Sequence, residues 1–187
     1  RNLLLKEIKP MSFFKKFWEL QVYSIVANSN LIDEHPYKSR PQDWILPFKG
    51  LGFWNDGSKA RIFMMGNFFA WTLGTFGIFL FCIRFPKDKF LEHRGQVKYF
   101  QDHRFFKRFG HKICFLFGAY LLHYLPFYLM GRSLYLHHYL PAFMFSVLIT
   151  AAQFDFMTRK LSNQKLRLAL LTFVLVGTLF AFIYLLP

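Results

Sequence analysis

Cysteine and acidic residues are scarce in this sequence of 187 residues. Its two cysteines, Cys82 and Cys114, form no Cys-x-x-Cys motif, so the sequence indicates neither a disulfide framework nor a cysteine metal site. Asp and Glu number 10 against 24 Lys and Arg, which gives a net charge of +14. A chain this basic is typical of proteins that bind nucleic acid or that lie in membranes.

Apolar residues are abundant, and they decide between these two classes. They make up 54% of the chain, with 27 Phe, and they gather in long runs with the basic clusters between them. This pattern argues against a nucleic-acid partner and predicts an all-α, multi-spanning membrane protein, because about 20 apolar residues cross a bilayer as a helix. The four predicted spans are residues 62–83, 113–130, 134–157 and 168–187.

The charges between the spans predict the orientation of the chain. Residues 84–112 hold nine Lys or Arg against three acids, and residues 158–167 hold four Lys or Arg with no acid. In contrast, the turn at residues 131–134 holds only Arg132. By the positive-inside rule, the loops at 84–112 and 158–167 are cytoplasmic, whereas residues 1–61 and the 131–134 turn are lumenal or external.

The chain divides into two parts on this pattern. Residues 1–61 contain "SFFKKFWELQVYSIVANSN", which predicts an amphipathic helix with Ser12 as its N-cap, followed by a loop rich in Pro and Trp. Residues 62–187 form the four-span transmembrane region. The chain begins with Arg1 and ends within an apolar run, so we expect it to be a piece of a longer protein, cut at both ends.

Polar and helix-breaking residues gather at the predicted lumenal face. "GNFFAW" opens the first span, "HYLPFYLMGR" closes the second, and "LHHYLPA" opens the third. Ionisable residues inside a membrane are costly, so they indicate a functional site. Asp155 lies at the opposite, cytoplasmic end of the third span, which argues against it as a catalytic base for chemistry at this face.

These blocks resemble the protein O-mannosyltransferases. "HYLPFYLMGRSLYLHHYLPA" is similar to the late transmembrane region of that family, and "HPYKSRPQDWILPFKGLGFW" is similar to the segment that leads from its lumenal MIR domain back into the membrane. "GNFFAW" resembles the family's Gly-Asn-Pro-x-x-Trp pattern, although Phe68 stands in place of the proline. The order and spacing match over nearly the whole chain.

The resemblance implies an endoplasmic reticulum membrane enzyme of the GT-C type with about eleven spans. Such an enzyme moves mannose from dolichyl phosphate mannose to Ser or Thr of acceptor proteins, needs no other cofactor, and works as a dimer with a related subunit. The family's catalytic acid lies in its first lumenal loop, which has no counterpart here. No catalytic residue is therefore expected in this segment, which would be inactive alone.

Two other classes of protein are weighed against this one. A non-catalytic membrane scaffold, or a pseudoenzyme subunit of such a complex, stays open as an alternative, and the missing N-terminal loop would distinguish it. A transporter or channel would need charged residues at the centres of its spans, and these spans show none there apart from His123.

Arg132, His137 and His138 are the first candidates for binding the lipid-linked donor. Arg132 either holds a lipid phosphate or contacts headgroups by snorkelling. His137 and His138 are neighbours whose side chains should diverge by about 100° on a helix, so they should not both enter one pocket. Either one of them lines the donor pocket, with the other against a neighbouring helix, or they serve only in structural hydrogen bonds between helices. A metal site is not expected, because the residue four positions after His137 is Pro141.

Three further candidates have structural alternatives of their own. Tyr139 either contacts the donor or belongs to an aromatic belt with Tyr124 and Tyr135. Asn67 either lines the cavity or caps the first span. Arg40 either faces the site or pairs with an acid such as Asp43 or Glu34.

Overall fold

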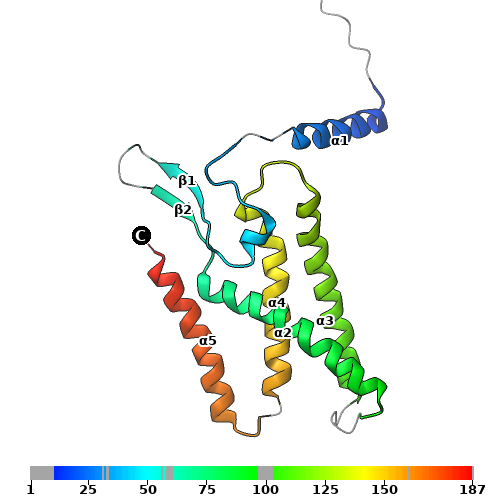
Figure 1. The fold of residues 1–187 in the computed structure, drawn as a ribbon, viewed down its shortest axis with the longest axis vertical. Coiled ribbons are helices and arrows are strands. Elements are labelled where there is room, and N and C mark those ends of the chain that lie inside the picture. The colour runs from blue at the N-terminus through cyan, green and yellow to red at the C-terminus, as the bar shows by residue number, and fades with distance from the viewer. Residues whose placement is uncertain are drawn as a thin grey trace, which may run out of the picture.

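The computed structural model describes residues 11–30, 32, 34–55, 57, 61–96, 103–159 and 161–186. A short helix lies across one end of a set of longer helices (Figure 1). In chain order the elements are α1 Phe13–Ser29, η1 Pro41–Trp44, β1 Leu51–Asn55, β2 Arg61–Met64, α2 Phe68–His93, α3 His103–Tyr124, η3 Leu125–Leu129, η4 Leu136–Tyr139, α4 Leu140–Thr158 and α5 Gln164–Tyr184.

Four stretches in the described part of the chain are long and apolar enough to cross a membrane: Phe68–His93, Lys107–Leu129, Leu136–Thr158 and Gln164–Tyr184. The helical, four-span architecture predicted from the sequence is therefore confirmed. The antiparallel hairpin of β1 and β2 is an addition that the apolar pattern did not predict.

The first span differs from its predicted bounds at both ends. It begins at Phe68 rather than at residue 62, because Arg61–Met64 pairs with β1 and Asn67 then caps the helix. It also runs on to His93, so part of the predicted loop at 84–112 is helical, and α3 already begins at His103. Ion pairs along the helix support this extension, between Arg84 and Asp88 and between Lys89 and Glu92.

Small residues let α2 and α4 pack closely. A Cβ atom added at Gly77 would lie 1.9 Å from Thr150 Oγ1, so only glycine fits there. Gln153 of α4 donates a hydrogen bond of 2.7 Å to the carbonyl of Gly77. Close approach through small residues with hydrogen bonds across the interface is the usual means of packing helices in lipid. This contact makes α2 and α4 the centre of the bundle.

Aromatic rings attach α3 to this centre. The rings of Phe81 and Phe117 lie 4.8 Å apart, and those of Phe109 and Phe156 stack at 4.5 Å. In contrast, α5 buries only Ala181. Figure 1 shows α5 standing apart from α3 and α4 over much of its length.

A docked loop, residues 34–47, covers one end of α2, α3 and α4. The Tyr124 hydroxyl donates to the Pro41 carbonyl at 2.9 Å, and the Ser39 N–H donates to the Leu134 carbonyl at 2.9 Å. Trp71 of α2 donates through Nε1 to the Trp44 carbonyl at 2.7 Å. The loop is thus bonded to α2, to the end of α3 and to the turn before α4, and its own Trp44 is completely buried.

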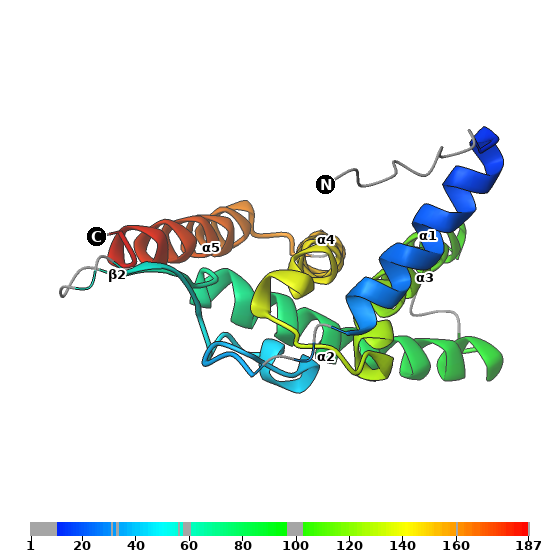
Figure 2. The same ribbon diagram turned by 90° about the horizontal axis from the view of Figure 1, so that it is seen from above.

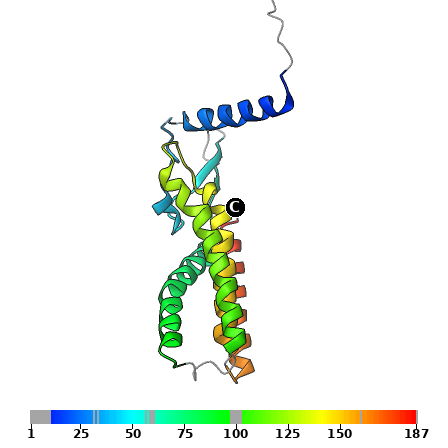
Figure 3. The ribbon, with the colours of Figure 1, turned by 90° about the vertical axis from the view of Figure 1, so that its right-hand side faces the viewer.

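Helix α1 lies roughly perpendicular to α3 and α4, on the same side of the molecule as the docked loop (Figures 1 and 3). None of its residues is buried, and its apolar side chains are exposed. Ser12 stands at the N-cap position, as predicted, but its side chain makes no capping hydrogen bond. The view from above shows α1 extending over α3 (Figure 2).

Candidate functional site

The turn between the second and third spans is shaped by its sequence. Tyr135 is extended, and Leu136–Tyr139 then forms a single 3-10 turn that leads directly into α4. Pro141 lies in the first turn of α4, where its missing N–H costs nothing. Pro141 therefore fits the start of this helix, and the turn before it holds Arg132, His137 and His138 at the end of the bundle.

Arg132 and His138 bind each other. Arg132 Nη2 lies 2.7 Å from His138 Nε2, and His138 Nδ1 lies 3.0 Å from the Tyr135 carbonyl oxygen. Because a guanidinium can only donate, Nε2 accepts and Nδ1 carries the ring proton, which it donates to the Tyr135 carbonyl. The Tyr135 N–H, 3.2 Å from the same Nδ1, cannot donate to it in this tautomer. His138 is therefore neutral in this arrangement, and both of its nitrogens are occupied.

Arg132 has a second partner from a distant part of the chain. Its Nη1 donates to the Oδ1 of Asn28 near the end of α1, 104 residues away in sequence. Its Nε is buried and makes no hydrogen bond, and no carboxylate among the described residues forms an ion pair with Arg132. The guanidinium is thus held in place by two neutral acceptors while its charge stays unbalanced.

The two histidines do not diverge as the sequence predicted. Their rings lie 4.2 Å apart with an angle of 27° between the ring planes, so they stack on one another. The tight turn and the bond from Arg132 to His138 place them together. His137 remains exposed and stacks on Tyr135 at 5.9 Å. His137 is therefore on the outside of the pair, and His138 is the one that holds Arg132.

Trp44 forms the base of this arrangement. Its ring is parallel to that of His138 within 10°, at 6.3 Å, and its Nε1 donates to Ser39 Oγ at 2.8 Å. Phe127 contacts both rings edge-on. We call Asn28, Trp44, Arg132, His137 and His138 the Arg132 cluster.

Tyr139 and Tyr124 lie in the core, which contradicts the aromatic-belt interpretation for these two residues. Tyr139 is 1% exposed, and its hydroxyl lies 3.3 Å from that of Tyr120. Tyr124 is 7% exposed and bonds to the docked loop. Tyr139 therefore supports the cluster from below, with its ring 6.3 Å from that of Trp44.

Asn67 and Arg40 lie outside the Arg132 cluster. Asn67 Oδ1 accepts from the N–H of Ala70 at 3.0 Å, and its Nδ2 donates to the Thr178 carbonyl of α5 at 2.9 Å. Asn67 is thus a helix cap and a link to α5, as one of its two interpretations predicted. The Arg40 side chain is exposed.

Asp43, one of the expected partners of Arg40, is bound differently. Its carboxylate accepts from the backbone N–H of Arg40 at 3.0 Å, whereas its ion-pair partner is Lys49 at 3.4 Å. These contacts lower the pKa of Asp43, chiefly through the bond from the Arg40 N–H. The carboxylate serves to hold the docked loop in shape.

The Arg132 cluster is suited to binding an anion. The guanidinium of Arg132 carries a full positive charge that no carboxylate of the described residues pairs with, so the cluster attracts an anionic group such as a phosphate. The stacked rings beside it give an apolar wall for whatever the phosphate carries. No group of three or more His, Cys, Asp or Glu within the described residues could hold a metal ion.

Two residues of the cluster were not predicted from the sequence. Asn28 lies near the end of a helix that the sequence pattern kept separate from the spans, and Trp44 belongs to the predicted loop rich in Pro and Trp. The dense Pro and Trp content of residues 36–54 was a signal that this loop is ordered, but it did not indicate what the loop contacts.

Comparisons with known proteins agree on one family. The family model described as the C-terminal four TMM region of protein-O-mannosyltransferase matches residues 13–187. The chain is 34% identical over 153 residues to dolichyl-phosphate-mannose–protein mannosyltransferase 4 of Candida albicans, covering 81% of this chain and 20% of the relative. It is 34% identical over 167 residues to protein O-mannosyl-transferase 2 of Danio rerio, covering 86% of this chain and 21% of that protein.

A solved structure shows the same fold. It is the S. cerevisiae protein O-mannosyltransferase Pmt1-Pmt2 complex bound to the sugar donor, with a TM-score of 0.84 and 26% identity. The match covers 94% of this chain and 24% of that one. This chain therefore spans about a fifth of the length of the curated relatives it matches. Sequence, fold and spans together show that this multi-pass membrane chain belongs to the protein O-mannosyltransferase family, as its C-terminal four-span region.

Proposed function

We propose that this segment provides donor-binding residues of an enzyme that transfers mannose from dolichyl phosphate mannose to Ser or Thr of proteins. The names of the curated relatives support the reaction, and the Arg132 cluster supports the role. The observation on which the proposal depends is the guanidinium of Arg132. It is fixed by Asn28 and His138, and it lacks a carboxylate partner among the described residues.

The physical reason concerns the charge that develops during transfer. As the bond from mannose to the phosphate breaks, negative charge grows on the phosphate that leaves with the lipid. A cation already positioned at that point stabilises this charge without having to reorganise. Arg132 meets this requirement because its two neutral partners orient the guanidinium without neutralising it.

The base that activates the acceptor hydroxyl is proposed to lie in the remainder of the intact enzyme. Asp43, the acid of the docked loop, is bound to Lys49 and to the N–H of Arg40. Asp155 lies at the far end of α4, where it pairs with Arg159 and Arg167. Neither carboxylate faces Arg132, so this segment alone is expected to be inactive.

The setting of the enzyme is proposed from the charge pattern and from the relatives. The basic segments at 84–112 and 158–167 would face the cytoplasm, which places the Arg132 cluster on the lumenal side of the endoplasmic reticulum membrane. The solved relative is a complex of two protein O-mannosyltransferases, which supports a dimer of this protein with a related subunit.

Replacement of Arg132 tests the donor-binding role. In the intact enzyme, Arg132→Ala should lower kcat/KM for the lipid donor about ten- to a hundredfold, because a hydrogen bond to a charged group contributes about 1.5–3 kcal/mol. Arg40→Ala is the matched control, since this exposed arginine lies outside the cluster. Initial rates would be measured over a series of donor concentrations at saturating acceptor peptide.

Equal donor dependence of the Arg132→Ala variant and the parent enzyme would contradict the role of Arg132 in donor binding. A loss that appeared only in the KM for the acceptor peptide would contradict it too. Absence of transfer by the purified parent dimer would instead support a scaffold subunit.

A further inference from the structure

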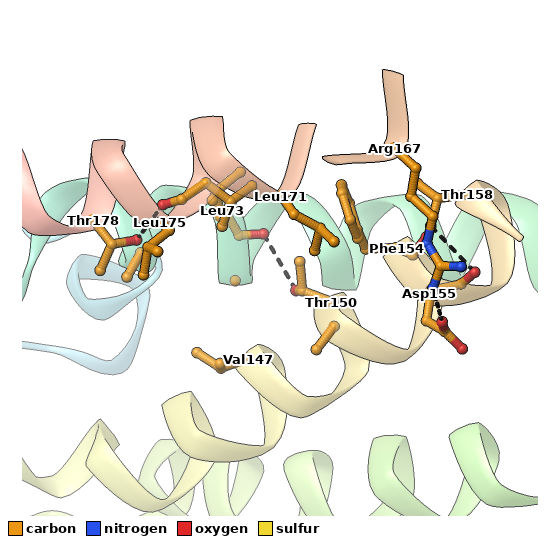
Figure 4. A pocket seen from close by; sticks show the side chains of 14 residues that line it. Leu73, Val147, Thr150, Phe154, Asp155, Thr158, Arg167, Leu171, Leu175 and Thr178 are labelled. Carbon is orange, nitrogen blue, oxygen red and sulfur yellow. Dashed lines mark hydrogen bonds and ion pairs between the residues drawn. The ribbon is translucent and has the colours of Figure 1, made fainter. Parts of the chain in front are cut away.

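A second site lies at the opposite end of α4. An apolar cavity of about 480 Å³ opens between α2, α4 and α5 (Figure 4). It exists because α5 is attached to its neighbours at two separate places. Near its C-terminal end, Gly177 packs on Phe69 and the Thr178 carbonyl accepts from Asn67. Near its N-terminal end, Arg167 pairs with Asp155. The space between these attachments is the cavity.

The wall of the cavity is suited to a hydrocarbon chain. Its lining is mostly aliphatic, and its hydroxyl groups are bonded to the helices that bear them. Thr150 donates to the Ser146 carbonyl at 2.7 Å, Thr158 to the Phe154 carbonyl at 2.8 Å and Thr178 to the Val174 carbonyl at 2.8 Å. A polar ligand would therefore lose its hydration without gaining partners. The aliphatic lining includes Leu73, Val147, Ala151, Leu171, Val174 and Leu175.

One end of the cavity, which we call the mouth, is lined by Thr158 and Arg167 and is positively charged. Asp155 accepts from Arg159 Nε at 2.7 Å and from Arg167 Nη2 at 3.2 Å, so one carboxylate faces two guanidiniums (Figure 4 shows Asp155 and Arg167). Residues 160 and 165 are lysines as well, and residues 158–167 contain no acid, so the mouth attracts anions.

The length of the cavity matches one leaflet of a bilayer. Its lining runs from Val147 to Thr158 on α4 and from Arg167 to Thr178 on α5. Each of these stretches rises about 17 Å at 1.5 Å per residue. The hydrocarbon core of a bilayer is about 30 Å thick, so the cavity extends about halfway across. A chain that entered at the charged mouth would end near the middle of the membrane.

We propose that this cavity binds one acyl chain of an anionic phospholipid, with the lipid phosphate against Arg167 and Arg159. The lipid comes from the leaflet that faces the basic segment at residues 158–167. This site is separate from the Arg132 cluster, which lies before the first turn of α4, and its occupant belongs to the opposite leaflet. The bound lipid would fill the space that α5 leaves open and hold α5 in place.

Photocrosslinking tests the site. The intact protein would be placed in nanodiscs containing phosphatidylserine or phosphatidylcholine with a diazirine on the acyl chain, and the labelled residues would be mapped by mass spectrometry. Phosphatidylserine should label Ala151 and Leu175. Each basic residue near a membrane surface favours an anionic lipid about fivefold, so Arg167→Gln should lower this labelling about fivefold.

Matched variants separate the site from general lipid contact. Arg167→Lys keeps the charge and should keep the preference for phosphatidylserine, and Arg108→Gln removes an exposed arginine of α3 and should change nothing. Ala151→Phe fills the cavity and should reduce labelling of α5, whereas Leu148→Phe enlarges an exposed residue outside the lining. The melting temperature of each variant confirms that it is folded.

Three results would overturn the proposal. The first is equal labelling of Ala151 and Leu175 by the two lipids in the parent protein. The second is labelling that Ala151→Phe leaves unchanged. The third is crosslinking of these residues to another span of the same polypeptide in place of lipid, which would show that protein fills the cavity.

Discussion

Arg132 and His138 show how one side chain can set the chemical state of another. The guanidinium requires an acceptor, so it selects the His138 tautomer that has a free lone pair on Nε2. A protonated His138 would place an N–H against the guanidinium and break the contact. His138 is therefore a positioning residue for Arg132, and it is not expected to supply or remove a proton during transfer.

This role predicts different effects for two replacements of His138. His138→Ala removes the acceptor and should lower kcat/KM for the lipid donor about tenfold in the intact enzyme, because Arg132 loses its orientation. His138→Gln keeps an acceptor oxygen that can face Arg132, so it should retain most of the activity. Donor kinetics of the two variants, measured alongside the parent, check the prediction.

A purely packing role for His138 would give another pattern. Its ring stacks on Trp44 and on His137, and neither replacement restores that stack. Equal losses in the alanine and glutamine variants, accompanied by equal falls in melting temperature, would therefore contradict the positioning role.

Helix α1 has no buried residue, so its packing does not show what surrounds it. All of its apolar side chains are exposed, yet Asn28 contacts Arg132 and so fixes which way the helix faces. At 100° per residue, Phe14 and Phe17 lie on the same side as Asn28, and Lys15 and Glu19 lie on the other. Val22, Tyr23 and Val26 also lie on that second side, so α1 is only weakly amphipathic.

The contact between α2 and α4 leads to a prediction about stability. Gly77→Val would place a branched side chain against Thr150 and displace the bond from Gln153, so it should lower the stability of the intact protein by about 1–3 kcal/mol. Gly118→Val on α3 is the control, because a Cβ atom there meets no atom of the described residues within 4 Å. Thermal unfolding in detergent would compare both variants with the parent. An equal shift in both would show that only the helical propensity of glycine matters.

The orientation of the whole molecule can be tested with single cysteines. Lys38 lies in the docked loop and Ser162 in the turn before α5, and both are exposed. In a cysteine-free background in sealed microsomes, Ser162→Cys should react with a membrane-impermeant maleimide. Lys38→Cys should react only after the membrane is permeabilised. The reverse pattern would contradict the proposed topology.

Much of the architecture could be predicted from the sequence because the bilayer imposes simple rules. A span needs about 20 apolar residues, and the four runs of this chain meet that length. The ends of the spans were harder to predict, since hydropathy does not register a cap or a strand. Because Asn67 caps α2, the helix begins six residues after the predicted start of the first span. Ion pairs stabilise the same helix beyond the predicted end of that span.

The candidate site was predicted only in part. Arg132 and His138 stood out because polar residues are costly in an apolar segment. Their bond to each other and the stacked histidines depend on a single 3-10 turn that the sequence pattern did not indicate. Tyr139 was placed in the wrong setting, because a tyrosine at the end of a span fits an aromatic belt or a buried core equally well.

The sequence by itself determined the class of this protein, the number of its spans and the face on which its polar residues gather. These properties depend on composition and on the order of residues along the chain, because a bilayer accepts any apolar run that is long enough to cross it. Only the tertiary structure decided that Asn28 and Trp44 join Arg132, and that α5 leaves a cavity beside α4. Such contacts join residues far apart in sequence, and they depend on how the side chains of several helices pack together.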